Sequence, residues 1–174
     1  MARKPRFNLG GYVYHVCNRG SRKGELFGSY DDYDAFLPIL EEARARFAMR
    51  IPAYALMRTH FHFLLWPRTD SALSGFMQRL QENHAATFHY RRGSRGTGAV
   101  YQARFVSRTI PDDRNYYSTW RYVEGNPLKA RYVERAEDWP WCSAWHAEGG
   151  PMLFHPDPGP LPKLPYWTEF LNDL

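Results

Sequence analysis

The stretch IPAYALMRTHFHFLLWP, residues 51–67, decides the fold. Two runs of apolar and aromatic residues are separated only by Arg58-Thr59, a pattern that predicts two short antiparallel strands joined by a tight hairpin. The second strand places His60 and His62 on either side of a phenylalanine. Because successive side chains of a strand point to opposite faces, we expect the two imidazoles to share one face of the sheet.

Outward from this hairpin, the spacing of apolar residues predicts the other elements. Pro38 would kink the first helix or mark a late start, and Asp70 or Ser71 is expected to cap the second. The order β-α-β-β-α-β plus a further helix predicts an α+β, ferredoxin-like (split βαβ) fold, with an antiparallel sheet, helices and an extra C-terminal helix. The predicted segments are strands at 10–20 and 99–110 and helices at 30–50, 71–90 and 111–125.

The length of 174 residues allows one domain with a substantial core. We expect residues 1–147 to form this domain and residues 148–174, rich in proline and glycine, to form an extended tail whose aromatic end docks onto the body. No apolar run reaches the roughly 20 residues of a membrane span, and the basic first residues do not resemble a signal peptide. We therefore expect a cytoplasmic protein in which Cys17 and Cys142 are reduced.

Positive charge is concentrated in two parts of the sequence, near its beginning and in the glycine-rich segment YRRGSRGTG. The net charge is +5 and the pI about 9.3. Fixed cations gain affinity for phosphates by releasing counterions, so this pattern suits a nucleic acid; ordinary solubilising charge is the alternative. The residues expected to contact nucleic acid are Arg3, Lys4, Arg6, Arg19, Arg22, Arg91, Arg92, Arg95 and Arg104.

Two pairs of residues carry possible chemistry. Neutral imidazoles two strand residues apart, as at His60 and His62, can converge on one divalent metal ion; histidines satisfied within the core are the alternative. Tyr122 and Asn126 are four positions apart and so face the same way on a helix. If that helix crosses the histidine face, Asn126 would complete a three-ligand site beside the Tyr122 phenol. Taken singly, they read as a packing residue and a helix-ending residue.

Four segments, in this order and at these separations, resemble the single-tyrosine HUH transposases, specifically the repetitive-extragenic-palindrome (REP)-associated tyrosine transposases. They are GYVYHVCNRG, LMRTHFHFLLWP, YQARFVSRTI and WRYVEGNPLKARYVERAEDWPWCSA, and the resemblance covers about residues 1–145. The two histidines that give HUH its name match His60 and His62. The nucleophile of the family, and its polar metal ligand four residues later, match Tyr122 and Asn126.

The resemblance implies a metal-dependent endonuclease and strand transferase that acts on single-stranded DNA carrying a hairpin. Mg²⁺ or Mn²⁺, held by His60, His62 and Asn126, would activate the scissile phosphate. Attack by Tyr122 would give a 5′-phosphotyrosine and a free 3′-OH, which rejoin strands in the reverse reaction. In the family the substrate is a palindromic hairpin flanked by a short tetranucleotide. The protein would then be nucleoid-associated, and we favour a monomer over a dimer that exchanges helices between sites.

The sequence departs from the family pattern at two places. Arg58-Thr59 stands where a Pro-Asn pair is common before the first histidine, and Gly125 stands where a bulkier residue usually precedes Asn126. The glycine favours a more mobile helix end. No general base is identifiable for removing the phenolic proton.

Other tyrosines and histidines compete for these roles. Tyr116 and Tyr117 are rival nucleophiles, but neither has a polar residue four positions later. His15 would approach the metal only if the first strand neighbours the HFH strand. His84 and His89 are five positions apart, which neither a helix nor a strand brings together, so we expect them to be surface or core histidines.

Two other function classes stay open. A catalytically silent module that presents aromatic residues to single-stranded nucleic acid would explain the charge and the aromatic content, but not the histidine pair. A zinc hydrolase would explain the histidines, but no carboxylate or third histidine lies at a recognisable ligand spacing.

Overall fold

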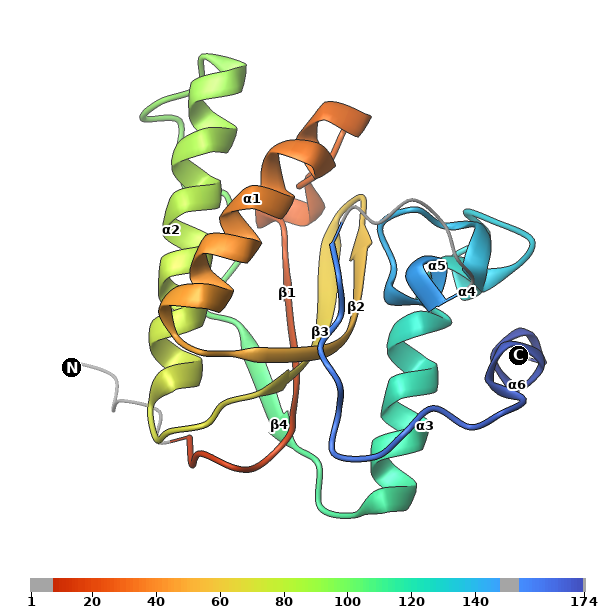
Figure 1. The fold of residues 1–174 in the computed structure, drawn as a ribbon. Helices are drawn as coiled ribbons and strands as arrows, with labels where there is room; N and C mark the ends of the chain where they lie inside the picture. Colours follow the sequence, from red (N-terminus) through yellow and green to blue (C-terminus); the bar gives the residue numbers. More distant parts are fainter. Residues whose placement is uncertain (1–7, 148–153, 174) are drawn as a thin grey trace.

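Four strands form one antiparallel sheet in the order β2-β3-β1-β4 (Figure 1). They were located in a computed structural model that describes residues 8–147 and 154–173. This arrangement confirms the predicted α+β fold and the hairpin between the second and third strands. The strands are β1 (Tyr14–Arg19), β2 (Arg50–Met57), β3 (His60–Trp66) and β4 (Val106–Thr109).

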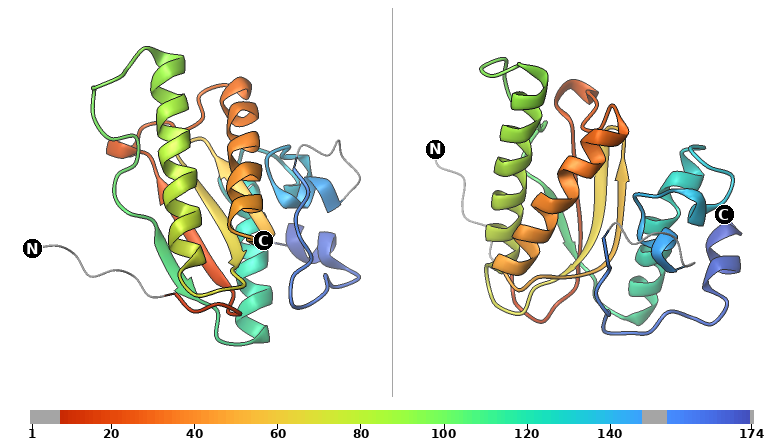
Figure 2. Two further views of the ribbon diagram at one scale, coloured as in Figure 1. Left: turned by 60° about the vertical axis from the view of Figure 1, so that its left-hand side comes forward. Right: turned by 45° about the horizontal axis from the view of Figure 1, so that its top comes forward.

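Helices cover both faces of this sheet (Figure 2). The long helices α1 (Tyr30–Arg46) and α2 (Ala72–Arg92) pack side by side on one face, and α3 (Asp113–Glu124) packs against β2 and β3 on the other. The shorter elements are η1 (Ser21–Lys23), α4 (Asn126–Lys129), η2 (Ala136–Asp138), α5 (Ser143–Ala147) and α6 (Trp167–Asn172).

The larger core lies between the sheet and the two long helices, as the apolar stripes predicted. Phe36 of α1, Phe76 of α2 and Phe61 of β3 are fully buried in it. Pro38 lies inside α1, so it does not mark a late start of that helix. Burial of each large apolar side chain in this core stabilises the fold by about 1.5–3 kcal/mol.

The predicted side-chain cap of α2 is wrong. Ser71 precedes the helix with φ +62° and makes no side-chain cap hydrogen bond. Asp70 instead accepts a hydrogen bond from the backbone N–H of Gly10 at 2.8 Å. The aspartate therefore fastens the chain before β1 and is not available to the first turn of α2.

The fourth strand is shorter than predicted. Residues 106–109 form the continuous ladder with β1, and this ladder ends at Cys17 opposite Val106. Residues 103–105 bulge away from β1, and the amide of Asn18 donates to the carbonyl of Ala103 at 3.0 Å. Before this bulge the chain again lies beside the end of β1, where the N–H of Gln102 donates to the carbonyl of Arg19 at 3.0 Å and Tyr101 bridges Gly20. Phe105 leaves the ladder to join the larger core. The alternation of residues 99–105 therefore reflects burial of one side of an irregular segment.

The smaller core lies under α3 and includes the last described residues. Trp120 of α3, Ala55 of β2 and Trp167 of α6 belong to it. The small side chains of β2 let α3 approach the sheet closely. Trp167 and Leu171 are buried in this core, so the predicted docking of the aromatic end of the tail is confirmed. Phe154 packs in addition into the larger core. Among the described helices, none has the length and apolarity needed to cross a membrane.

Candidate active site

The strand order brings three histidines together on the α3 face of the sheet. His62 of β3 lies opposite Cys17 of β1, which places His15 diagonally beside it. His15 Nε2 lies 3.0 Å from His62 Nδ1, and the two rings stack with centroids 5.2 Å apart. The rings of His60 and His62 meet edge to face at 5.1 Å. The prediction that the HFH imidazoles share a face is confirmed, and β1 does neighbour their strand.

Helix α3 carries Tyr122 to this cluster. The helix begins at an N-cap, Asp112, whose side chain accepts a hydrogen bond from the N–H of Asn115 at 2.8 Å. The Tyr122 ring meets the ring of His62 edge to face at 5.3 Å, and that of His15 at 5.7 Å. Yet 40% of Tyr122 remains exposed. A phenol is thus held against imidazoles with access to solvent.

A cavity of about 520 Å³ opens beside the Tyr122 ring. His15 and His62 form one part of its lining, and Arg108 of β4 and Thr119 of α3 form another. The exposed Arg108 guanidinium is suited to bind a phosphate in this cavity. The cavity therefore brings a phenol, imidazoles and a cation around one space.

A buried carboxylate anchors the end of α3 that carries the phenol. Glu124 is fully buried, and its oxygens accept hydrogen bonds from Ser143 Oγ at 2.6 Å and Trp167 Nε1 at 2.7 Å. Lys163 Nζ lies 3.3 Å from Glu124 Oε2 and supplies the compensating charge. Because a buried charge is stable only when it is paired and hydrogen-bonded, these contacts fix the position of Tyr122 through the backbone.

Burial lowers the pKa of all three histidines. The pKa of His62 falls to about 3, with the neighbouring histidines contributing to the shift. Burial also lowers the pKa of His15, helped by Arg108, and that of His60, helped by Arg19. The imidazoles are therefore neutral at pH 7, which is the form that binds metal ions.

The histidines of the HFH segment each keep one ring nitrogen for a metal ion. His60 Nδ1 lies 3.0 Å from the Thr59 hydroxyl, and His62 Nδ1 lies 3.0 Å from His15 Nε2. If each Nδ1 carries the proton, each Nε2 presents a lone pair. A hydrogen bond at one nitrogen orients the ring for a metal at the other, as is usual for metal-bound histidines. The residues present therefore fit a divalent ion.

Asn126 follows α3 as the first residue of α4 and is buried. Its Nδ2 donates to the carbonyl of Tyr122 at 2.6 Å, which leaves Oδ1 as the atom that a metal would use. Within residues 8–147 and 154–173, no group of three His, Cys, Asp or Glu side chains could hold a metal ion. A three-ligand site here therefore needs an amide as well as the imidazoles.

The family is established by comparison with known proteins. The sequence model of the family described as "Transposase IS200 like" matches residues 9–126, more than half of the chain. The chain belongs to the IS200-like transposase family. The matched part includes the three histidines and Tyr122, and the family indicated by the sequence motifs is confirmed.

Two proteins similar to this transposase carry a more specific description. Over 167 residues it is 24% identical to a Haemophilus influenzae protein described as a putative REP-associated tyrosine transposase, covering 91% of this chain and 93% of that protein. Its fold is similar to that of a solved REP-associated tyrosine transposase bound to a REP hairpin. That match has a TM-score of 0.67 and 19% identity, and covers 93% of this chain and 100% of the other.

The rival tyrosines of the transposase are not placed for attack. Tyr116 is buried in the smaller core, and burial raises the pKa of its phenol. The Tyr117 hydroxyl donates to the carbonyl of Pro162 at 3.0 Å. His89 contacts Ser94 through Nδ1 at 2.9 Å and lies away from the HFH cluster, on α2. Of the tyrosines of α3, Tyr122 alone meets the histidines.

Two of the predicted phosphate contacts lie next to the HFH histidines. Arg19 and Arg104 line a cavity of about 770 Å³ together with His60 and His62. Lys23 lines the same cavity. None of the described residues that line it is acidic. Arg22 is exposed in η1, directly before Lys23.

The remaining predicted cations lie elsewhere or outside the described residues. Arg91 and Arg92, at the end of α2, pair with Asp32, the latter at 2.6 Å. The Arg95 guanidinium lies 5.7 Å from the ring centroid of Tyr90. Contact of these three with nucleic acid stays a prediction. Arg3, Lys4 and Arg6 fall in residues 1–7, outside the described part of the chain.

Sequence reasoning did not single out some residues of the site. Arg108 was left out of the predicted contacts, although register with His15 places it at the site. Lys129 Nζ lies 5.3 Å from the ring centroid of Tyr122. Its position one helical turn beyond Asn126 was the available signal.

Proposed function

We propose that this transposase cleaves and rejoins single-stranded DNA beside a REP-type hairpin, with Tyr122 as the nucleophile. In this proposal Mg²⁺ or Mn²⁺ is bound by His60, His62 and Asn126 Oδ1. The observation that carries the proposal is the exposed Tyr122 phenol packed against neutral His62 at the edge of a cavity that contains Arg108. The match to a structure with a bound REP hairpin supports the choice of substrate.

In the proposed reaction the Tyr122 oxygen attacks the phosphorus of the scissile phosphodiester. A bond forms between that oxygen and phosphorus, and the bond from phosphorus to the 3′ oxygen breaks. The Tyr122 phenol loses its proton to solvent and the leaving 3′ oxygen takes one up, so that a free 3′ hydroxyl is formed and no net proton is consumed. The phosphate stays on the protein as a 5′-phosphotyrosine. One phosphodiester replaces another, so rejoining needs no external energy source.

Positive charge near the phenol assists this step. The Lys129 ammonium is 5.3 Å from the Tyr122 ring centroid, and Arg108 lines the cavity. Both favour the negative charge that develops on the attacking oxygen and on the phosphate. A bound divalent ion would in addition withdraw charge from the scissile phosphate.

We also propose that the active unit is a monomer. Tyr122 meets the histidines of its own chain, and Glu124 fastens the same helix to α5 and to residues 163–167. A helix exchanged between subunits would have to break these buried contacts. Mixing Tyr122→Phe with His62→Ala should therefore restore no cleavage, whereas an exchanged-helix dimer would recover activity in mixed dimers.

The principal test uses hairpin-bearing single-stranded oligonucleotides labelled at the 3′ end. Because the phosphate stays on the protein, the labelled 3′ fragment should run with the protein on a denaturing gel in Mg²⁺ or Mn²⁺. EDTA and Tyr122→Phe should each abolish the adduct.

Tyr116→Phe is the matched control, because the Tyr116 hydroxyl is buried with no hydrogen-bond partner in the described structure. This variant should form the adduct at the normal rate. Binding with no adduct would favour a silent nucleic-acid-binding module. Cleavage that survives Tyr122→Phe would favour a hydrolase.

A further inference from the structure

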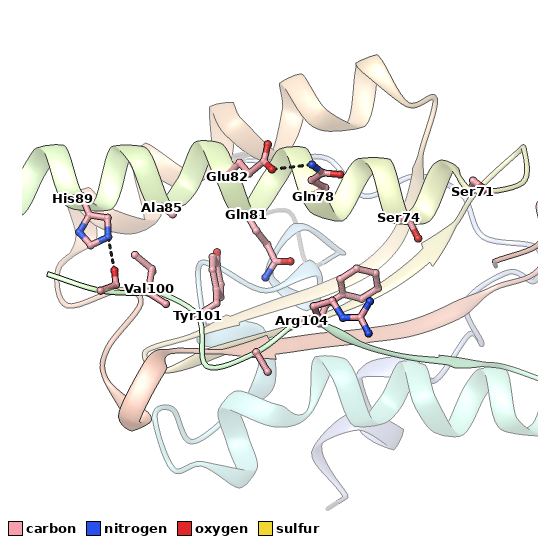
Figure 3. Close-up of a pocket in the computed structure, with 14 residues that line it drawn as sticks. Ser71, Ser74, Gln78, Gln81, Glu82, Ala85, His89, Val100, Tyr101 and Arg104 are labelled. Carbon is pink, nitrogen blue, oxygen red and sulfur yellow. Dashed lines mark hydrogen bonds between the residues drawn. The ribbon is translucent and has the colours of Figure 1, made fainter. Parts of the chain in front are cut away.

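A groove of about 780 Å³ runs between α2 and residues 98–105 (Figure 3). Ala85 of α2 lines one side, and Val100 and Phe105 line the other. Its volume is within the ~300–1,000 Å³ typical of sites for small organic ligands. The carbon lining suits the faces of a flat ring.

One polar side chain in the groove is free to bind. Figure 3 shows Gln81 pointing from α2 into the space beside the segment that carries Tyr101 and Arg104. In the part of the chain that the structure describes, its amide makes no hydrogen bond. By contrast, His89 Nε2 contacts the carbonyl of Gly98 at 3.1 Å. An amide both donates and accepts, as recognition of the edge of a nucleobase requires.

The groove is continuous with the proposed catalytic site. Ala103 and Arg104 line both the groove and the cavity of His60 and His62. His62 in turn lines the cavity of Tyr122. The path passes around the β4 edge of the sheet, where β4 is only 4 residues long and its ladder with β1 ends at Cys17.

Cations follow this path. Arg108 lines the Tyr122 cavity. Arg19 and Lys23 line the cavity of His60 and His62, here called the middle cavity, and Arg104 lies where this cavity joins the groove. Glu82 is the acidic residue among the described residues that line the three spaces. Spaced cations beside a ring-sized groove match a single nucleic-acid strand, whose phosphates and bases alternate in this way.

We propose that the groove between α2 and residues 98–105 binds an unpaired nucleobase of the DNA strand that is cleaved at Tyr122. The inference rests on the proposed function and adds to the site a subsite that recognises a base of the substrate. Phosphates follow Arg108, the middle cavity and Arg104, and the base enters between Ala85 and Phe105. Gln81 binds its edge. The groove therefore selects the sequence of the unpaired segment beside the hairpin.

The test compares two tryptophan substitutions on neighbouring residues of α2. Ala85→Trp fills the groove, whereas Ala86→Trp places the same side chain at an exposed position outside it. Binding to a fluorescent hairpin with unpaired flanks is measured by anisotropy in the Tyr122→Phe background. Ala85→Trp should weaken binding about tenfold, as loss of one base contact does. Ala86→Trp should bind like its parent.

Abasic substitutions along the flanks locate the base. One position should weaken binding to the parent about tenfold and should have no further effect on Ala85→Trp. Gln81→Ala, a milder change, should weaken binding about threefold at that position alone. Equal binding by folded Ala85→Trp and Ala86→Trp, or equal abasic effects in parent and variants, would overturn the proposal and leave the groove to another ligand. Because binding is measured without cleavage, this outcome is distinct from a missing Tyr122 adduct.

Discussion

Two of the histidine–tyrosine contacts in the described part of the chain differ in one decisive respect. His62 meets Tyr122 with ring centroids 5.3 Å apart, and His84 meets Tyr101 at 5.7 Å. Both imidazoles are buried, and burial lowers the pKa of His62 to about 3 and that of His84 to about 4. In residue type, ring geometry and direction of the pKa shift, the two pairs are nearly the same.

The difference lies in what each phenolic oxygen contacts. The Tyr101 hydroxyl lies 2.5 Å from His84 Nδ1, and Phe27 and Phe36 pack on that imidazole. Tyr122 remains 40% exposed beside a cavity. A shifted pKa therefore does not by itself identify a reactive histidine. The reactive pair is identified by its access to solvent and by a phenolic oxygen that is free of a hydrogen-bond partner among the described residues.

The largest expected effect comes from removing each imidazole. His62→Ala should slow adduct formation at least about 100-fold, because one of the proposed metal ligands is lost. His84→Ala should leave the rate per folded molecule within about threefold, but lower the free energy of unfolding by about 3 kcal/mol through the cavity and the unpaired Tyr101 hydroxyl. Adduct gels and urea unfolding measure the two. A slow but stable His84→Ala protein would contradict the comparison.

The pH dependence of the unfolding free energy should reveal the low pKa of His84. Because the pKa of folded His84, about 4, lies below that of an unfolded histidine, about 6.5, the unfolded state binds the proton first as the pH falls. Stability is therefore full above pH 6.5 and is lost toward pH 4. Between pH 6.5 and 5, His84 should account for about 2 kcal/mol.

The comparison of wild type with His84→Leu isolates this contribution. The leucine variant lacks the titrating ring, so its unfolding free energy should fall less between those two pH values. Identical acid dependence of the two proteins would show that His84 titrates normally.

A smaller effect on cleavage is expected from replacing Asn126, whose amide follows the Tyr122 helix. Asn126→Ala should slow metal-dependent adduct formation about tenfold and weaken Mn²⁺ binding by a similar factor, because Oδ1 is removed from the proposed ligand set. Titration of the Mn²⁺ dependence measures both. Asn126→Asp restores an oxygen ligand and should recover part of the rate. Unchanged Mn²⁺ dependence in the alanine variant would remove Asn126 from the site.

The smallest effect is expected on stability, from replacing Tyr101. Tyr101→Phe removes the hydrogen bond to His84 and should lower the free energy of unfolding by about 1 kcal/mol. Thermal unfolding measures this change, and adduct formation should be unaffected. A loss of cleavage as large as that of Tyr122→Phe would show that the two pairs share a function.

Local patterns predicted the parts of the site that are close in sequence. Strand alternation placed His60 and His62 on one face, and the spacing of four residues brought Asn126, the first residue of α4, to the backbone carbonyl of Tyr122 in α3. The position of His15 could not be derived, because it depends on β1 and not β4 lying beside β3. The ion pair of Arg92 with Asp32 could not be predicted from local sequence either, because it joins α2 to α1.

Other differences arise where tertiary contacts outweigh local preference. Residues 99–105 alternate like a strand, but Tyr101 and Phe105 pack against the core, and residues 103–105 bulge so that the ladder with β1 is interrupted. From sequence alone, a glutamate at the end of a helix, such as Glu124, is expected to be exposed. Its burial follows only from Lys163 and Trp167, which are distant in sequence.

The buried carboxylate of Glu124 also makes the position of Tyr122 depend on a segment distant in sequence. Lys163 and Trp167 supply the cation and the indole donor of that carboxylate. Without them the carboxylate would be buried with neither partner, which is costly in an apolar interior. Removal of residues 154–173 should therefore loosen α3 and, with it, the Tyr122 phenol.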